Sequence, residues 1–306
     1  MGRGVGQGSS SLTFSGVGKL VITSFRMKTY YPVVQALRGL ATALVCFYHF
    51  VAYSDFRGVL FESDSVLKRL ANACTGSVFI FFVLSAFVLP MSLLQKDGWK
   101  GFVPFMVRRI IRIEIPYILS IVLILVVGFL FAKKNHIDFV IDLDRLLHHL
   151  TYSIPFSQYE WHNIIFWTLA IECQFYLMVG LFFVVRSWGC RPLNYALIAA
   201  FAISGCFVQD HRLIFYYSPI FILGVLFLLI RMNNISLRMG MIAIWLTMIV
   251  IVHYHGLQIA AYSTFTLVAI QFGDRVWKYA NTLGDMSYSI YLTHGISGGH
   301  VLYFFA

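Results

Sequence analysis

Charged residues are scarce in this sequence: Asp, Glu, Lys and Arg make up 12% of its 306 residues, whereas 59% are hydrophobic. A water-soluble domain of this length needs far more polar surface than that composition supplies. The segments between the apolar runs are also too short to form a separate catalytic domain. The composition therefore excludes a soluble globular enzyme, and any activity must belong to the membrane-embedded part of the chain.

Disulfide and metal-binding patterns are also missing. The sequence has five cysteines, which lie mostly inside apolar runs and match neither a disulfide framework nor a zinc spacing. His136, His148 and His149, with Asp142 and Asp144 nearby, fit no standard metal site either. We therefore expect no metal ion, and we expect the cysteines to be small buried hydrophobic residues.

What the sequence does contain is a series of long apolar runs. A helix needs about 20 apolar residues to cross a bilayer. The candidate spans cover residues 33–53, 76–95, 113–132, 164–185, 193–209, 213–230, 239–254, 256–272 and 283–305. This pattern predicts an all-α fold, a polytopic transmembrane helix bundle of about nine to ten spans.

The basic residues predict the orientation of the bundle. With the N-terminus in the cytoplasm, most of the 23 Lys and Arg residues fall on the inner side, as the positive-inside rule requires. Topology thus accounts for the net charge of +10, and no nucleic-acid partner is expected. Residues 1–28, which are basic and rich in Gly and Ser, are interpreted as a disordered cytoplasmic tail or as translation upstream of a start at Met27.

Two ionisable residues interrupt the first apolar run. Such groups cost free energy inside a membrane and are therefore functional candidates. The spacing of Arg38 and His49 places them on one helix face, about 16 Å apart along the axis. Alone, Arg38 could simply extend to the inner headgroups, and His49 could be a satisfied core imidazole. Their shared face favours a joint role.

A cluster of arginines opens the third run. Arg108, Arg109 and Arg112 occupy little more than one helical turn. Guanidinium forks bind phosphate oxygens in pairs, so the cluster could hold a phosphorylated ligand. It could equally be a positive-inside anchor that Glu114 partly neutralises.

The fourth run carries a carboxylate near its outer end. Glu172 lies about one and a half turns below that boundary, and His49 about one turn below it. Two titratable groups at similar depth on different helices are what an acid/base pair needs, so we predict that they meet. Glu172 could instead pair with Arg212 or be capped by tyrosine hydroxyls. The last run adds a polar group that is either catalytic or a seam between helices: Tyr288, Tyr291 and His294.

Five motifs occur in order along the chain. They are QALRGLATALVCFYH at 35–49, GSVFIFFVLSAF at 76–87, RRIIRIEIPY at 108–117, WTLAIECQFYL at 167–177 and LGDMSYSIYLTH at 283–294. Together they resemble the acyltransferase 3 family of membrane acyltransferases. The resemblance covers nearly everything from residue 31 onward, so residues 29–306 are expected to form one membrane acyltransferase domain.

The resemblance implies transfer of an acyl group, often acetyl, from a cytoplasmic acyl-CoA-type donor to a hydroxyl. Acceptors in the family are usually carbohydrates on the far side of the membrane, and sometimes lipids. The expected partners are thus the donor, a carbohydrate or lipid-linked acceptor, and membrane lipid. The donor would be a co-substrate, with no bound cofactor. We expect an integral protein of the cell (inner) membrane.

The resemblance also implies roles for individual residues. Arg38 and His49 match the family's first-helix pair, Arg109 and Arg112 match its Arg-x-x-Arg motif, and Glu172 matches its acidic residue. Three departures stand out. Ala86 replaces a usual Gly and should crowd a helix contact, Cys173 replaces a common second acid, and the predicted spans are one fewer than usual.

These observations predict a division of labour. The arginines, with Arg108 in support, would hold the donor at the inner mouth, and Tyr288 would stabilise the oxyanion. His49 would be the general base or, as an alternative, a transient acyl carrier, oriented by Glu172, with Tyr291 and His294 in support. One rival is a proton-coupled transporter or acyl-group flippase that uses the same charges as a proton relay. Another is a scaffold subunit whose charges only pair helices.

The predicted topology can be tested by labelling single introduced cysteines in intact cells. A membrane-impermeant thiol reagent should label sites in the 133–160 loop and at residue 306, because the lysine and arginine asymmetry places them outside. Sites in residues 1–30 and in the 96–112 loop should stay unlabelled until the cells are opened. Labelling of the 96–112 loop from outside would reverse the orientation.

Overall fold

The computed structural model describes residues 31–53, 65–93, 98–273 and 278–296. All regular elements within these ranges are helices, so the all-α prediction is confirmed. The predicted cytoplasmic tail, residues 1–28, lies outside the described residues.

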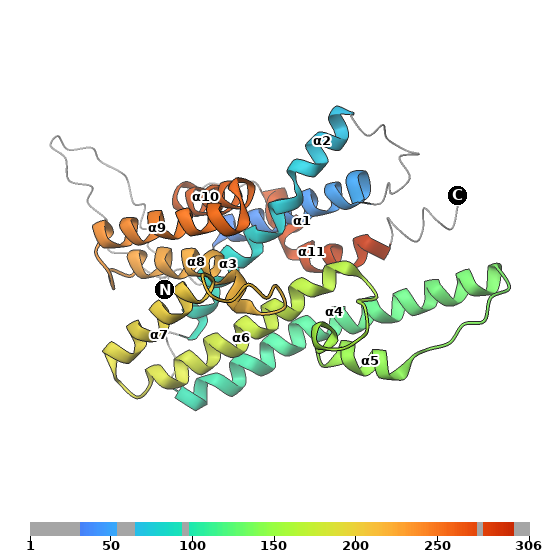
Figure 1. The fold of residues 1–306 in the computed structure, drawn as a ribbon, viewed down its shortest axis with the longest axis horizontal. Coiled ribbons are helices and arrows are strands. Elements are labelled where there is room, and N and C mark those ends of the chain that lie inside the picture. Colours follow the sequence, from blue (N-terminus) through green and yellow to red (C-terminus); the bar gives the residue numbers. More distant parts are fainter. Residues whose placement is uncertain (1–30, 54–64, 94–97, 274–277, 297–306) are drawn as a thin grey trace, which may run out of the picture.

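The described helices form one bundle, in which α2 leads directly into α3 (Figure 1). In chain order they are α1 (Pro32–Tyr48), α2 (Val66–Ala73), α3 (Phe79–Leu93), α4 (Gly98–Lys134), α5 (Leu143–Leu150), α6 (Trp167–Arg186), α7 (Arg191–Ser204), α8 (Ser218–Arg231), α9 (Leu237–His255), α10 (Leu257–Phe272) and α11 (Lys278–Gly295). A π-helical turn, His49–Tyr53, extends α1. Short 3-10 turns are Thr75–Val78, Ile154–Phe156, Ile164–Phe166 and Ile214–Tyr217.

Among the described residues, six segments are long and apolar enough to cross a membrane by length and composition. They are Pro32–Val51, Val66–Leu93, Gly101–Lys134, Ile164–Arg186, Ile214–Arg231 and Leu237–His255. The helix α10 is apolar but shorter, with 16 residues, and α7 has 14. These two, and the more polar α11, stay predicted spans.

The outward face of α4 shows what surrounds the bundle. This helix has 37 residues, which makes it about 55 Å long. Ile111, Ile115 and Leu119 along it are 52%, 63% and 66% exposed. A continuous stripe of large exposed apolar side chains suits lipid and not water. The protein is therefore an integral membrane protein.

The start of α4 corrects the predicted boundary of the third span. The sequence pattern placed residues 96–112 in an inner loop, whereas the helix already begins at Gly98. Arginine and methionine are good helix formers, and Val103 and Val107 continue the exposed apolar stripe below the arginines. The predicted arginine cluster therefore lies inside a rigid helix.

The helix α3 forms the centre of the bundle and packs closely on α8. Val83, Ala86 and Phe87 of α3 are fully buried. A Cβ added at Gly224 of α8 would lie 2.8 Å from the Cβ of Ala86. The crowding expected at Ala86 is thus avoided because its neighbour on α8 has no side chain.

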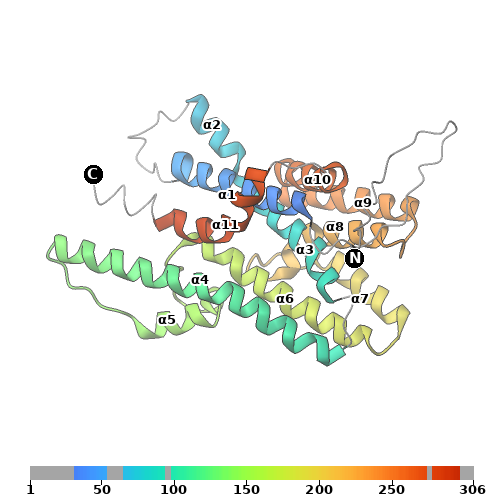
Figure 2. The ribbon, with the colours of Figure 1, turned by 180° about the vertical axis from the view of Figure 1, so that it is seen from behind.

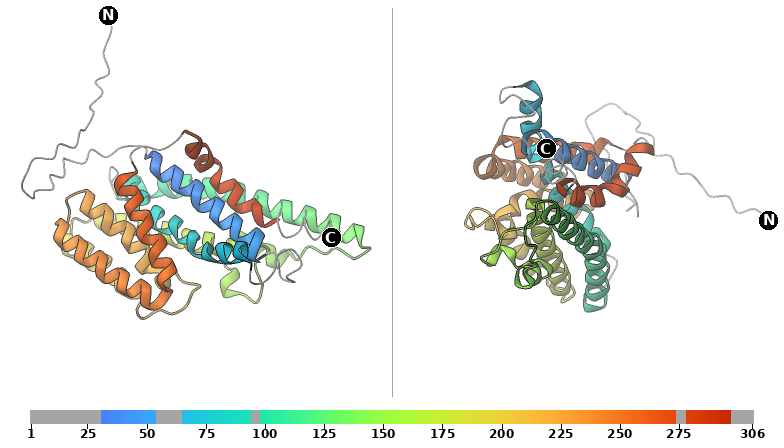
Figure 3. Two further views of the ribbon diagram at one scale, coloured as in Figure 1. Left: turned by 90° about the horizontal axis from the view of Figure 1, so that it is seen from above. Right: turned by 90° about the vertical axis from the view of Figure 1, so that its right-hand side faces the viewer.

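The helices α1 and α11 make another close contact. A Cβ at Gly284 would lie 2.1 Å from the carbonyl oxygen of Gln35, so the two backbones nearly touch. The hydroxyl of Thr42 donates to the carbonyl of Ser287 at 3.2 Å. Viewed from above, α1 lies between α10 and α11 (Figure 3). Figures 1 and 2 show α4 and α6 side by side on the other side of the bundle.

The cysteines follow the prediction only in part. Cys74 is buried, but Cys190 is exposed because it lies in the short turn between α6 and α7. The five cysteines are free thiols.

Candidate active site

A narrow cavity of 80 Å³ lies between α1, α3, α4, α6 and α11. Its charged lining residues are Arg38 of α1, Arg109 and Arg112 of α4, and Glu172 of α6. We call it the arginine cavity. The structure thus brings the three predicted donor-binding residues together from distant parts of the chain. Arg108 is exposed and lies outside this lining.

Positive charge exceeds negative charge in the arginine cavity. Arg38 interacts electrostatically with Arg112, Glu172 and Arg109, so one carboxylate faces three guanidinium groups. The Nε atom of Arg38 is buried, and no described residue accepts a hydrogen bond from it. Glu114, which the alternative membrane-anchor interpretation had neutralise part of the arginine cluster, does not line the cavity. A partly buried cluster with excess positive charge favours an anionic ligand.

Hydroxyl groups hold the carboxylate of Glu172 in this cavity. Its Oε1 accepts a hydrogen bond from the hydroxyl of Tyr176 and another from Ser85 at 3.4 Å. The guanidinium carbon of Arg109 lies 5.8 Å from the centre of the Tyr176 ring, within cation–π range. Tyr288 lines the same cavity and donates to a backbone carbonyl of α4 at 3.3 Å.

His49 lies apart from these groups, where the π-helical turn begins. Its ring packs edge-on against that of His294, with centroids 5.0 Å apart. The Nδ1 atom of His294 lies 2.6 Å from the carbonyl oxygen of Tyr291. Because a carbonyl can only accept, Nδ1 carries the hydrogen, and Nε2 bears the lone pair of the neutral ring. The structure therefore pairs His49 with a second histidine.

The predicted pairing of His49 with Glu172 does not form. On α6, Glu172 shares one helix face with Thr168 and Tyr176, and that face lines the arginine cavity. Trp167, which directly precedes Thr168, lines the cavity that contains His49 instead. The two residues were predicted to meet from their depth alone, whereas the direction of the side chain on α6 places Glu172 with the arginines. Its other predicted partner, Arg212, pairs with a neighbouring carboxylate, that of Asp210, at 2.7 Å.

A hydrogen-bonded layer separates the arginine cavity from the histidine pair. The hydroxyls of Tyr291 and Thr168 lie 2.9 Å apart, and both residues line the cavity. Phe81 packs edge-on against Tyr291, with ring centroids 5.5 Å apart. The ring of Tyr291 also lies 5.8 Å from that of His294. An extended ligand that passes this layer would reach the histidines.

A second cavity of 850 Å³ has His49 in its lining. We call it the outer vestibule, after its side in the predicted topology. Four of its lining residues are aromatic: Tyr159, Trp161, Trp167 and Tyr217. Glu160 and Asn163 add polar groups, and the side-chain nitrogen of Asn163 is buried with no hydrogen-bond acceptor among the described residues. Both the volume and the lining suit a small organic ligand.

Residues 143–163 cover one side of the vestibule, and we call them the outer cap. The ring of His149 stacks on that of His162, with centroids 4.5 Å apart and an angle of 8°. The backbone N–H of His162 donates to Nε2 of His149 at 3.2 Å, and Nδ1 of His149 lies 3.1 Å from the Tyr117 hydroxyl. Arg145 donates to the carbonyl of Glu160 at 2.7 Å.

The stacking and hydrogen bonds of the outer cap were not predicted. The histidines near residue 149 were considered only as metal ligands. Within the described ranges, no group of three His, Cys, Asp or Glu residues could hold a metal ion. His149 instead joins the outer cap to α4 through the Tyr117 hydroxyl. This contact links residues far apart in the sequence, so no local pattern predicts it.

The fold and the site together define a class of protein. An apolar helix bundle surrounds a cationic cavity, a titratable pair lies beyond it, and a larger cavity opens on that pair. This arrangement suits an integral membrane enzyme that brings an anionic substrate and a second substrate together inside the bundle.

Comparison with known proteins identifies the family. A family model described as an acyltransferase domain matches residues 32–304, and the chain therefore belongs to the acyltransferase 3 family. The chain is also similar to a protein of Acidianus two-tailed virus named "Putative acetyltransferase ORF330". The two are 23% identical over 292 residues, which cover 87% of this chain and 83% of that protein. No solved structure shows a significant match. The protein is thus a membrane acyltransferase.

The stacked histidines predict that the outer cap loosens in acid. Burial first, and then the neighbouring His162 and Arg145, lower the pKa of His149 from 6.5 to about 3. Burial and Arg145 lower that of His162 to about 4. Below pH 6.5 the unfolded cap binds protons that the folded cap does not, so stability should fall as the pH falls from 6.5 towards 4. Hydrogen exchange of residues 143–163 between pH 7.5 and 4 measures this loss.

A matched pair of variants isolates the effect. His162→Phe keeps a flat ring against His149 but cannot titrate, so protection should fall less steeply with pH. His211→Phe, at an exposed histidine of a neighbouring loop, should retain the wild-type slope. Equal slopes in both variants would show that the stacked pair does not set the acid sensitivity.

Proposed function

We propose that the protein transfers an acyl group, expected to be acetyl, from a cytoplasmic acyl-CoA-type donor to a hydroxyl of a carbohydrate or lipid-linked acceptor of the cell envelope. The observation that supports this most is the pair of cavities on either side of the Tyr291–Thr168 layer. The arginine cavity has the charge for the donor, and the outer vestibule has the size and lining for the acceptor.

The dimensions of the arginine cavity suggest how the donor binds. A volume of 80 Å³ is too small for a nucleotide but suits part of a thin thioester arm. The exposed Arg112 and its neighbour Arg109 would meet the donor phosphates at the mouth, and Arg38 would act farther in. Arginine forks hold phosphate oxygens in pairs. Glu172 would offset part of the positive charge and fix Tyr176.

The chemistry would take place at the pair of His49 and His294. His49 removes the proton from the acceptor hydroxyl, and the hydroxyl oxygen attacks the thioester carbonyl carbon. The new C–O bond forms, the C–S bond breaks, and the departing thiolate takes the proton that His49 removed from the hydroxyl. His294, held by its bond to the Tyr291 carbonyl, replaces Glu172 as the group that orients His49. Tyr291 would donate to the oxyanion while its oxygen accepts from Thr168. Tyr288, the donor that the sequence suggested, already donates to the carbonyl of Ile113 and would have to give up that bond to take part.

The lining of the vestibule supports a carbohydrate acceptor. A sugar has apolar C–H faces and a rim of hydroxyls, so it needs flat apolar surfaces with a few polar groups between them. Trp161 and Trp167 offer such surfaces, and Glu160 and Asn163 offer an acceptor and a donor. A lipid-linked sugar would present the same rim of hydroxyls to His49.

This assignment predicts that different mutations will affect donor binding, acceptor binding and turnover separately. Purified protein in nanodiscs would be assayed with radiolabelled acetyl-CoA and envelope extract. His49→Ala should lower kcat by about 10²–10⁴-fold, the usual range for general acid–base catalysis, with donor affinity retained. Arg109→Ala should weaken donor binding because a phosphate contact is lost, and Arg109→Lys should restore it only in part. Glu160→Ala should raise only the KM for the acceptor.

The control is Arg108→Ala, which removes the same charge one residue away and outside the cavity lining. It should leave donor affinity close to wild type. Equal losses in Arg108→Ala and Arg109→Ala would reduce the arginines to a membrane anchor. Wild-type turnover by His49→Ala would remove that residue from the mechanism.

A further inference from the structure

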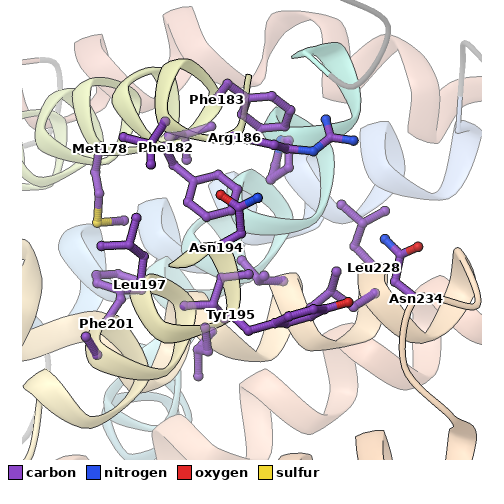
Figure 4. Close-up of a pocket in the computed structure, with 18 of the residues that line it drawn as sticks. Met178, Phe182, Phe183, Arg186, Asn194, Tyr195, Leu197, Phe201, Leu228 and Asn234 are labelled. Atoms are coloured by element: carbon purple, nitrogen blue, oxygen red, sulfur yellow. The ribbon is translucent and has the colours of Figure 1, made fainter. Parts of the chain in front are cut away.

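A third cavity, of 830 Å³, lies between α6, α7 and α8. Figure 4 shows Met178, Phe182 and Arg186 of α6 along one wall, with Leu197 and Phe201 of α7 along the facing wall. It does not share a charged residue with the arginine cavity or the outer vestibule. We call it the lateral cleft.

The lateral cleft exists because α7 packs loosely. None of the described side chains of this helix is buried, whereas most of the neighbouring α8 is. Apolar walls inside a bilayer do not hold water, because water there would lack hydrogen-bond partners. An apolar space of this size beside lipid is therefore filled by hydrocarbon.

The length of the cleft matches one leaflet of the membrane. Its α6 wall runs from Phe175 to Arg186, the last residue of that helix. These positions are about 16 Å apart along the axis, close to half of the roughly 30 Å hydrocarbon thickness. The cleft thus spans the depth that an acyl chain of a single lipid occupies.

One end of the cleft is polar and positively charged. Arg186 and Arg191 line it, with Asn194 and Asn234 beside them, and none of its described lining residues is acidic. The side-chain oxygen of Asn194 is buried and accepts no hydrogen bond from the described residues. Two guanidinium groups can bind one phosphate, and the Asn194 oxygen needs a donor such as a headgroup hydroxyl. The arginines that could bind a phosphate and the Asn194 oxygen that needs a donor lie at the same end of the cleft, where its apolar walls stop.

We propose that the lateral cleft binds one anionic phospholipid. Its phosphate lies on Arg186 and Arg191, a headgroup hydroxyl donates to Asn194, and an acyl chain fills the space between Phe182 and Leu197. The bound lipid supports the back of α6. Phe175 of that helix lines the cleft and the adjacent Tyr176 lines the arginine cavity, so the lipid helps to hold the active-site face in position.

The test measures thermal unfolding of delipidated protein in detergent as phosphatidylglycerol is added, with phosphatidylcholine as the neutral comparison. Wild-type protein should be stabilised by phosphatidylglycerol at low mole fraction, since a ligand of the native state raises the unfolding temperature. Arg186→Gln/Arg191→Gln should need about tenfold more of it for half the shift, the effect of losing a charge-assisted contact. Native mass spectrometry should retain one phosphatidylglycerol on wild type and none on this variant.

Two further variants keep the result decisive. Arg238→Gln removes an exposed arginine at the start of α9, outside the cleft lining, and should respond like wild type. Leu197→Trp fills the cleft without changing charge and should lose the response. An equal loss in Arg238→Gln would mean general surface electrostatics and would overturn the proposal. So would stabilisation by palmitoyl-CoA but not by phosphatidylglycerol, because the cleft would then hold a donor chain.

Discussion

Excess positive charge inside a membrane protein is the constraint on which the site depends. Three arginines face one carboxylate in a cavity of 80 Å³, and the Nε atom of Arg38 has no described hydrogen-bond acceptor. Such a cluster costs free energy unless an anion offsets it. The hydroxyls of Tyr176 and Ser85 hold Glu172, and the Tyr176 ring lies in cation–π range of Arg109, but neither contact adds a negative charge. This excess of positive charge is what supports the proposal of an anionic, phosphorylated donor.

Close packing of small residues brings the rest of the site to this cavity. The backbones of α1 and α11 approach through Gly39 and Gly284, and this contact places Arg38 and His49 beside the polar face of the last helix. Gly224 accommodates Ala86 in the same way, so that α8 can pack on the central helix α3. Large side chains at these positions would separate the helices that carry the arginines from those that carry the histidine pair. The helices that form the site can approach one another because glycines lie at their contacts.

The sequence predicted the membrane bundle and the meeting of the arginines, because apolar runs and intramembrane charges are strong local signals. Arg38, Arg109 and Arg112 line one cavity as expected. Depth along a helix did not predict the partner of Glu172, since direction around α6 depends on how that helix is rotated in the bundle. The pairing of His49 with His294 likewise depends on a long-range contact. Neither rotation nor contact can be read from the spacing of residues within one run.

The central claim is that one acyl-CoA-type molecule enters from the arginine cavity and presents its thioester to the histidine pair. A structure of the protein in nanodiscs with a non-hydrolysable thioether analogue of acetyl-CoA tests this most directly. The account predicts density for phosphate within hydrogen-bond distance of Arg109 or Arg112. It also predicts that the thioether sulfur lies beyond the Tyr291–Thr168 layer, next to His49. Phosphates bound away from the arginines, or an arm that ends far from His49, would contradict it.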